Sequence, residues 1–235
     1  IDGSSLAQLQ ARTTEAHSLG IIEDRHLEAV LDKQKKLFPR GIPACGADGL
    51  RAYLLSHDIH EEVVRIQIDQ IEKIRRLTNK IWNIFRLLFA MLDREASNRR
   101  DGFLKMNVSL LDQSKLDLHD QQVLKEMSKC VYEAHDSFHN TYQLHRCFVH
   151  LENFMTKHLS QIYMEQIKSV FSPGNSLDEI QSCKLEVLAT CLLASIKILH
   201  PYMPHLSEYL FQKLMLHVNQ SATGSDDGMG EIRLL

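Results

Sequence analysis

The sequence predicts an all-α fold, an antiparallel helix bundle preceded by a short helical and irregular lead-in. Three observations favour it. The 235 residues include only 10 Gly and 5 Pro, which are too few turn-forming residues for many short strands. Apolar residues recur every three to four positions over several long stretches, as in amphipathic helices. With 44% hydrophobic residues, the chain can bury a core of domain size.

The first part of the chain predicts a lead-in rather than a piece of the bundle. Residues 1 to about 37 carry two short helical patterns, with Leu6 and Leu9 in the first and Leu27 and Leu31 in the second. The stretch 38–46 then holds two prolines and two glycines. Because Pro lacks an N–H donor and Gly frees the backbone, we expect an irregular connector there. We assign residues 1–55 to this lead-in.

The clearest helical pattern runs from Glu61 to Leu92. Its core-facing positions, spaced by three and four, are Ile71, Ile74, Thr78, Ile81, Phe85, Leu88 and Leu92. At about 100° per residue, the opposite side of this helix carries Arg76, Asn79, Lys80, Asn83 and Arg86, with Lys73 beside them. Trp82 lies on the border between the two sides. The pattern therefore predicts a helix with one apolar side and one basic, polar side.

Four further elements complete the predicted bundle, which we place at residues 56–217. After a polar stretch from Ala96 to Leu118, the second helix runs from about His119 to Phe138 and uses Leu124, Met127, Val131, Ala134 and Phe138. The third runs from about Tyr142 to Phe171 and uses Phe148, Leu151, Met155, Leu159 and Ile162. Antiparallel helices with short connections bury such stripes against one another.

A predicted capping box starts the fourth helix, because the side chains of Ser176 and Glu179 can each satisfy a free backbone N–H. This helix ends at Leu199. The segment His200–Pro204 turns the chain, and a short last helix carries Leu206, Leu210 and Leu214. The stretch 219–230 is rich in Gly, Ser and Asp, so we expect residues 218–235 to form a flexible tail.

Composition narrows the function classes. A formal net charge of −3 excludes a uniformly basic nucleic-acid binder but permits a local basic face. The five cysteines are widely spaced without a Cys-x-x-Cys pair, which favours a reducing compartment and argues against a disulfide framework or structural zinc. The chain has no run of 18 apolar residues, so we expect no membrane span. The chain starts at Ile1, so we expect its true N-terminus to be missing.

The basic side of the Glu61–Leu92 helix is the strongest binding candidate. Between Arg65 and Arg86 it has six Lys or Arg residues against two acids. Cationic side chains can contact phosphates, and the amides of Asn79 and Asn83 can hydrogen-bond base edges. On these residues alone, an RNA-binding surface and an ordinary solvated helix face both account for the pattern.

Two histidine pairs are candidates for metal ligands. His135 and His139 lie four residues apart, the spacing of a helical zinc pair, but no third ligand follows at a useful distance. His57 and His60 are expected to lie in a solvated turn. No nucleophile–base arrangement or phosphate-cradling Gly loop is present, so the sequence predicts no catalytic, metal or cofactor site in this chain.

Several motifs resemble one family, the valyl-tRNA synthetases. Residues 38–51 (Phe-Pro-Arg-Gly-Ile-Pro-Ala-Cys-Gly-Ala-Asp-Gly-Leu-Arg) match each fixed position of the family pattern between its KMSKS loop and its anticodon-binding bundle. Residues 79–83 are similar to its Asn-Lys-Leu-Trp-Asn helix, and His200–Pro204 to its closing His-Pro-Phe-Met-Pro segment. Tyr163, Glu165 and Lys168 resemble its Tyr-x-Glu-x-x-Lys pattern. The resemblance extends from residue 1 to about 217.

The resemblance implies the tRNA-binding part of a valine–tRNA ligase, a class Ia anticodon-binding bundle. The parent enzyme would attach valine to tRNA-Val, using ATP with Mg²⁺ in an upstream catalytic domain absent from this chain. This part would dock the inner corner and anticodon of the tRNA, without membrane or DNA partners. The candidate RNA-contacting residues are Arg75, Arg76, Asn79, Lys80, Asn83 and Arg86, with Arg99 and Arg100 as weaker candidates.

One motif inside the chain is a false match to the same family. Lys125–Lys129 reads Lys-Glu-Met-Ser-Lys, similar to the KMSKS loop that contacts ATP in class I synthetases. Because Met127 occupies a core position of a predicted helix, a mobile loop is excluded here.

The chain also departs from the family pattern. Leu77 replaces the Phe usually found two residues before the Asn-Lys pair, which argues against base stacking at that position. The Asp-Arg-Trp motif expected near the second helix is missing, with His119-Asp120-Gln121 in its place. Such divergence favours a mitochondrial-matrix enzyme, with the cytoplasm as the alternative. It also leaves open a non-catalytic paralogue that acts as a protein-interaction module.

Overall fold

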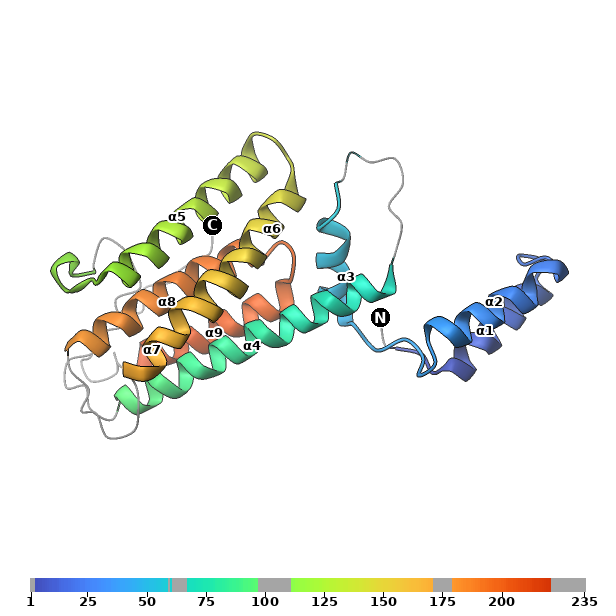
Figure 1. The fold of residues 1–235 in the computed structure, drawn as a ribbon, viewed down its shortest axis with the longest axis horizontal. Helices are drawn as coiled ribbons and strands as arrows, with labels where there is room; N and C mark the ends of the chain where they lie inside the picture. Colours follow the sequence, from blue (N-terminus) through green and yellow to red (C-terminus); the bar gives the residue numbers. More distant parts are fainter. Residues whose placement is uncertain (1–2, 59, 61–66, 97–110, 171–178, 221–235) are drawn as a thin grey trace.

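The computed structural model describes residues 3–58, 60, 67–96, 111–170 and 179–220. Within this part, regular structure is helical apart from one isolated β-bridge, so the predicted all-α fold is confirmed. Figure 1 shows a helix bundle and a two-helix hairpin that lies away from it. The described helices are α1 (Leu6–Ser18), α2 (Asp24–Leu37), α3 (Gly46–Leu55), α4 (Ile68–Ala96), η2 (Gln113–Lys115), α5 (Leu118–His139), α6 (Leu144–Asn153), η3 (Phe154–Tyr163), α7 (Met164–Val170), α8 (Glu179–Leu199) and α9 (Pro204–Gln220).

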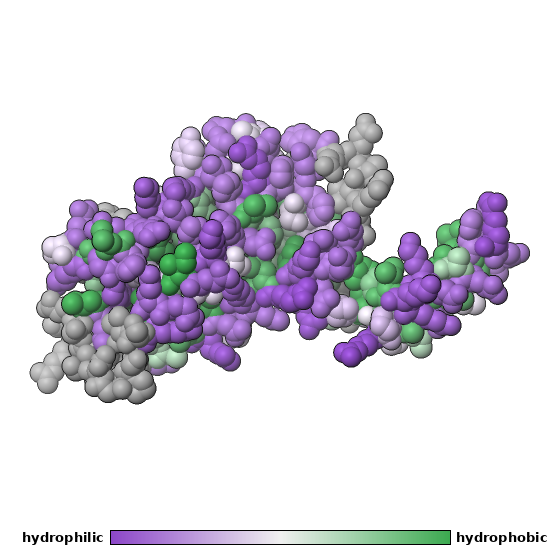
Figure 2. All heavy atoms as spheres, in the orientation of Figure 1, coloured by the Kyte–Doolittle hydropathy of each residue, from purple (hydrophilic) through white to green (hydrophobic). Residues whose placement is uncertain are grey.

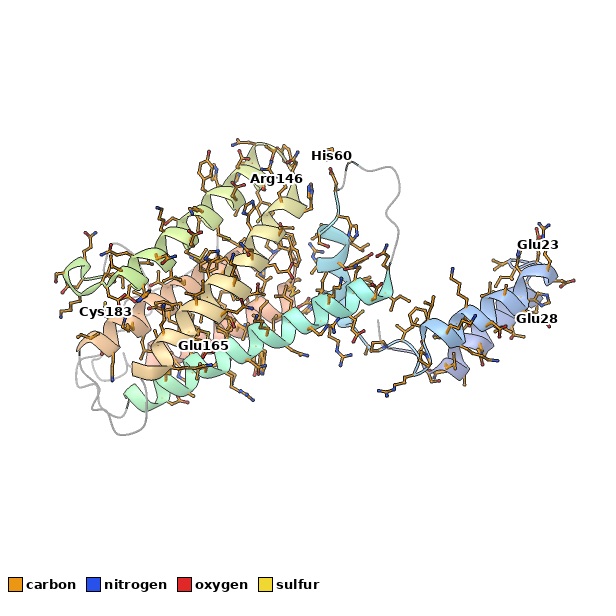
Figure 3. All side chains as sticks on the ribbon, viewed as in Figure 1. Glu23, Glu28, His60, Arg146, Glu165 and Cys183 are labelled. Carbon is orange, nitrogen blue, oxygen red and sulfur yellow. The ribbon has the colours of Figure 1, made fainter. Side chains whose placement is uncertain are left out.

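The hairpin of α1 and α2 has little core of its own. Ser5 caps α1 by accepting a hydrogen bond from the Gln8 N–H, and the Gln8 side chain accepts one from the Ser5 N–H. Thr13 is the one buried residue in these two described helices. Figure 3 shows Glu23 and Glu28 at the surface of the hairpin, far from the bundle. The hairpin is therefore a mostly solvated arm.

The Pro/Gly connector after α2 turns back against the first residues. Ser4 and Ile42 exchange two backbone hydrogen bonds of 2.9 and 2.8 Å. Gly41 has φ +82°, and a Cβ there would lie 2.2 Å from the Ser4 carbonyl oxygen, so the close approach requires glycine. The irregular connector was predicted, but α3 directly after it was not. Two glycines weaken its helical signal, whereas burial of Tyr53 stabilises it.

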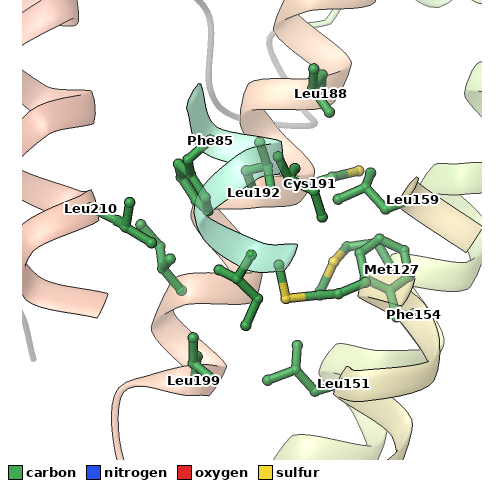
Figure 4. Packing of buried hydrophobic residues seen from close by; sticks show 14 of the residues in the cluster. Phe85, Met127, Leu151, Phe154, Leu159, Leu188, Cys191, Leu192, Leu199 and Leu210 are labelled. Carbon is green, nitrogen blue, oxygen red and sulfur yellow. The ribbon is translucent and has the colours of Figure 1, made fainter. Parts of the chain in front are cut away.

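The apolar side of α4 forms much of the bundle core (Figure 4). The predicted core positions are buried, except that Thr78 is half-buried and donates its hydroxyl to the Ile74 carbonyl at 3.1 Å. The buried stripe also includes Leu77 and Ile84, because α4 contacts α3, α8, α9 and η3. The described helix begins at Ile68 rather than Glu61, and residues 61–66 lie outside the described residues.

In each of the next two helices one predicted core residue is exposed, and Leu124 and Phe138 of α5 are half-buried rather than buried. In α5, Cys130 is buried while Val131 is 45% exposed, because the contacts with α6, η3 and α8 select the stripe through Met127 and Ala134. The predicted third helix is observed as α6, η3 and α7 in succession. Its middle segment, η3, is π-helical and has more residues per turn, which turns Ile162 outward.

The C-terminal elements close the bundle. Tyr202, in the turn predicted before the last helix, is fully buried and donates its hydroxyl to the Leu144 carbonyl at 2.7 Å. α9 extends to Gln220 and is longer than the short helix expected. The predicted capping box at Ser176 and most of the predicted tail lie outside the described residues. None of the described helices meets the length and hydropathy that a membrane-spanning segment requires.

A buried polar cluster ties α5, η3 and α8 together. The Lys184 ammonium contacts Asp117 at 2.5 Å and both carboxylate oxygens of Asp120 at 3.3 Å. The Tyr163 hydroxyl donates to Asp120 at 2.7 Å. Although burial alone would lower it, the hydrogen bond to Asp117 and the nearby carboxylates raise the pKa of Lys184. The cluster therefore holds a charged ammonium between two helices.

Candidate nucleic-acid interface

The solvent side of α4 presents the row of cationic and amide side chains predicted from the sequence. Five of these six predicted side chains are exposed, namely Arg75, Arg76, Asn79, Asn83 and Arg86. Within the described part of the chain, none of the five forms an ion pair. Figure 2 shows hydrophilic residues over much of the visible face of the bundle, including the first part of the diagonal along which α4 runs in Figure 1. We call these five residues together with Lys80 the basic face.

Lys80 occupies the edge of the basic face. It is half-buried, and its ammonium donates to the Thr156 carbonyl of η3 at 3.3 Å. A lysine ammonium has three donors, so one such bond leaves it able to contact a phosphate. The structure therefore places Lys80 at the seam between α4 and η3 rather than in open solvent.

A second border of the basic face is aromatic. Trp82 of α4 is 39% exposed and packs against Tyr209 of α9, with ring centroids 5.3 Å apart. Two turns further along, Phe89 stacks on His217 at 5.0 Å. The ammonium of Lys213 lies 5.7 Å from the centre of the Tyr209 ring. We call Trp82, Phe89, Tyr209 and His217 the aromatic seam.

The helical period arranges these residues in a fixed order. At about 100° per residue, positions seven apart nearly coincide and positions four apart are neighbours. From the α9 side to the η3 side, the order across α4 is Trp82 and Phe89, Arg75 and Arg86, Asn79 and Asn83, Arg76, and Lys80. One rigid helix thus combines ring faces, guanidinium groups and amides on a single surface. This combination can contact bases, phosphates and base edges together.

Leu77, at the position where the family usually has Phe, faces the core and is 6% exposed. A side chain at this position cannot stack on a base without unpacking the bundle.

Sequence reasoning thus excluded the position of Leu77 correctly, but it missed Tyr209 and Lys213. Their spacing of four indicated a shared helix face, whereas nothing in the sequence showed that α9 lies beside α4.

The KMSKS-like segment and the His135/His139 pair do not form binding sites in the described part of the chain. Met127, within the KMSKS-like segment, is buried in α5, which excludes a loop. The rings of His135 and His139 lie 4.6 Å apart on the exposed side of α5. Within the described ranges, no three His, Cys, Asp or Glu side chains converge as metal ligands would. Arg99 and Arg100, the weaker RNA candidates, lie outside the described residues.

The turn after α3 is a local hydrogen-bonded structure. His60 bonds to Asp58 through its backbone N–H at 3.0 Å and its ring at 2.9 Å, and these bonds lower the pKa of Asp58. His57 contacts the Tyr53 carbonyl at 2.8 Å. His57 and His60 therefore lie in a turn, as the sequence predicts.

Residues 120–229 match a family described as the anticodon-binding domain of tRNA ligase. This match covers 110 of the 235 residues, just under half of the chain. The relatives of the chain include the valine–tRNA ligase of Caenorhabditis elegans, 25% identical over 91% of this chain and 19% of the relative. The valine–tRNA ligase of Legionella pneumophila (strain Lens) is 28% identical over 91% and 22%. The human mitochondrial valine–tRNA ligase is 30% identical over 83% and 17%.

These matches confirm the resemblance to valine–tRNA ligases predicted from the motifs. The chain spans about a fifth of the length of these relatives. The matched anticodon-binding domain begins at residue 120, after α4. A match of 214 residues in a chain of 235, however, necessarily includes α4. The basic face therefore belongs to the part of the chain shared with the ligases.

Proposed function

We propose that this chain is the tRNA-binding part of a valine–tRNA ligase and that the basic face of α4 grips the tRNA backbone. The observation that carries the proposal is the row of five exposed cationic and amide side chains on one rigid helix. Arg75, Arg76 and Arg86 supply planar donors suited to phosphate oxygens, and Asn79 and Asn83 lie between them. The chain would position tRNA-Val and read its anticodon.

The relatives support a proposal for the activity of the whole protein. We propose that it attaches valine to tRNA-Val in a separate catalytic domain, where ATP with Mg²⁺ activates the amino acid. The described residues contribute no reacting group to this scheme. Their part is to hold the tRNA so that its acceptor end reaches the catalytic domain, which lowers the entropic cost of the transfer step.

Salt dependence tests the binding proposal. Each phosphate contact releases counterions, so the logarithm of the association constant should fall steeply and linearly with the logarithm of the salt concentration. We would measure binding of fluorescently labelled tRNA-Val to the 235-residue chain across a salt series. A flat salt dependence, or an absence of binding at low salt, would contradict the proposal.

A matched pair of variants locates the contact. The double substitution Arg76→Ala with Arg86→Ala removes two exposed charges from α4. It should weaken binding and lower the salt slope by about one unit per side chain. Lys125→Ala with Lys129→Ala removes the same charge from the exposed side of α5 and should change binding little. Equal losses in both variants would show that net charge, rather than the basic face, drives binding.

Anticodon discrimination separates a ligase part from a helical paralogue. We expect the chain to bind tRNA-Val more tightly than the same tRNA with an altered anticodon. Equal affinity for both RNAs, together with a bound protein that neither RNA displaces from the chain, would favour the alternative of a protein-interaction module.

We propose that the whole protein lies in the mitochondrial matrix. Mitochondrial valine–tRNA ligases of human, rat and mouse are among the relatives, at 28–30% identity, and the chain departs from the family pattern at Leu77. Valine–tRNA ligases without this designation match at 25–28%, so the identities alone do not decide the compartment. Subcellular fractionation with an antibody to the chain tests the proposal, and a purely cytoplasmic signal would contradict it.

A further inference from the structure

The aromatic seam between α4 and α9 combines solvent exposure with ordered ring packing. Trp82 is 39% exposed and Tyr209 is 46% exposed, yet their rings remain 5.3 Å apart with a tilt of 34°. In contrast, the aromatic residues that serve the core, Tyr163 and Tyr202, are at most 1% exposed and donate their hydroxyls to internal acceptors. The Trp82–Tyr209 pair therefore presents large rings to solvent at a fixed position, whereas Phe89 and His217 are half-buried.

Both helices carry positive charge beside these exposed rings. By the helical period, Arg75 and Arg86 are the next residues on α4 toward solvent, and Lys213 lies over the Tyr209 ring from α9. Asp93, an acid on the same side of α4, lies 3.4 Å from His217 at the far end of the seam. A ligand that pairs aromatic faces with negative charge fits this surface, and an unpaired nucleotide has both.

The spacing of the ring pairs suits bases that have left a regular stack. Trp82 and Phe89 are seven residues apart, which is about 10 Å along a helix. Successive nucleotides of a regular strand are about 3.4 Å apart along the axis. The two pairs are thus about three times too far apart for neighbouring stacked bases. Only bases splayed out of a regular stack could therefore occupy both pairs, and this is the form in which proteins read single-stranded RNA.

We propose that the aromatic seam is a stacking platform for unpaired bases of the RNA loop that the basic face holds by its phosphates. This inference rests on the proposed function and adds a second mode of contact to it. Phosphate gripping by Arg75 and Arg86 sets affinity without regard to base pairing. Stacking on Trp82 and Tyr209 makes the surface selective for single-stranded over duplex RNA.

Trp82 is the only tryptophan in the chain, so its fluorescence reports on this site directly. We would titrate the 235-residue chain with the anticodon stem-loop of tRNA-Val and with a blunt RNA duplex of equal charge. The stem-loop should quench the tryptophan emission, and the duplex should bind without quenching it. Unchanged emission while the stem-loop binds would overturn the platform.

Variants at Tyr209 provide an independent test. Tyr209→Ala should weaken stem-loop binding roughly 5- to 100-fold, the range for losing one stacked base, while leaving duplex binding unchanged. Tyr209→Phe keeps the ring and should bind as the wild type does. Tyr132→Ala is the matched control, because Tyr132 is a 71% exposed tyrosine on α5. Circular dichroism of each variant confirms folding.

The outcomes separate the two proposals. If neither RNA binds at low salt, the basic face does not grip RNA and both proposals fail. If both RNAs bind with a steep salt dependence but Tyr209→Ala and the wild type are indistinguishable, the phosphate contacts stand and the stacking platform alone is wrong.

Discussion

Replacing Lys184 with methionine should destabilise the bundle strongly, although methionine fills a similar volume. The Lys184 ammonium is the cation between Asp117 and Asp120, and the Asp120 side chain is only 1% exposed. Removing the cation leaves a buried carboxylate without a counter-charge, which costs about 3–5 kcal/mol in other proteins. The 2.7 Å hydrogen bond from Tyr163 to Asp120 remains, so we expect a loss near the lower end, about 3 kcal/mol.

Urea unfolding at neutral pH, followed by far-UV circular dichroism, measures this loss. The companion variant Asp120→Asn removes the buried charge while keeping an acceptor for Tyr163. In that background Lys184→Met should cost less, and the difference between the two costs should be about 2 kcal/mol. If Lys184→Met unfolds at the wild-type urea concentration, or if the two substitutions are simply additive, the ion cluster does not stabilise the fold as argued.

Three further predictions concern acid stability, core packing and thiol reactivity. Partial burial would raise the pKa of Asp117, but the hydrogen bond from Lys184 lowers it to about 2. The ionised Asp117 therefore stabilises the fold above about pH 4. This contribution disappears between pH 4 and 2. Because the Asp117 side chain is 46% exposed, the stability difference between wild type and Asp117→Asn should shrink by only about 1 kcal/mol over that range in urea titrations, and a constant difference would refute it. Phe85→Ala, at a fully buried position, should cost about 3–5 kcal/mol in the same assay, and a loss below 1 kcal/mol would show that this core position is loosely packed. Burial raises the pKa of the Cys130 thiol to about 12. A thiol reagent near pH 8 should therefore label the partly exposed Cys45 quickly and Cys130 only after denaturation. Rapid labelling of Cys130 in the folded chain would contradict its burial.

The sequence was most informative where one element's own period decides the outcome. The spacing from Ile71 to Leu92 specified which side of α4 is buried, and therefore which side carries exposed cations. The same logic excluded the KMSKS-like segment, since Met127 had to face a core. These predictions needed only a helical repeat and side-chain polarity, both of which are local properties.

Features that depend on neighbouring helices were beyond sequence reasoning. Val131 was expected in the core, but the orientation of α5 against its neighbours turns the stripe by one residue. Ile162 is exposed because the π-helical segment η3 changes the number of residues per turn. Tyr209 joins Trp82 only through the packing of α9 beside α4. The local sequence pattern of one helix does not encode such contacts.

Site-specific cross-linking tests the central claim most directly. A photoreactive amino acid would replace Asn83, at the middle of the exposed side of α4, or Tyr132 on α5 as a control, in the 235-residue chain. After irradiation with tRNA-Val, the modified nucleotides are mapped by primer extension. We predict cross-links from position 83 to the anticodon arm and few from position 132. Absence of RNA cross-links at position 83, with RNA captured at position 132, would contradict the claim that α4 grips the tRNA.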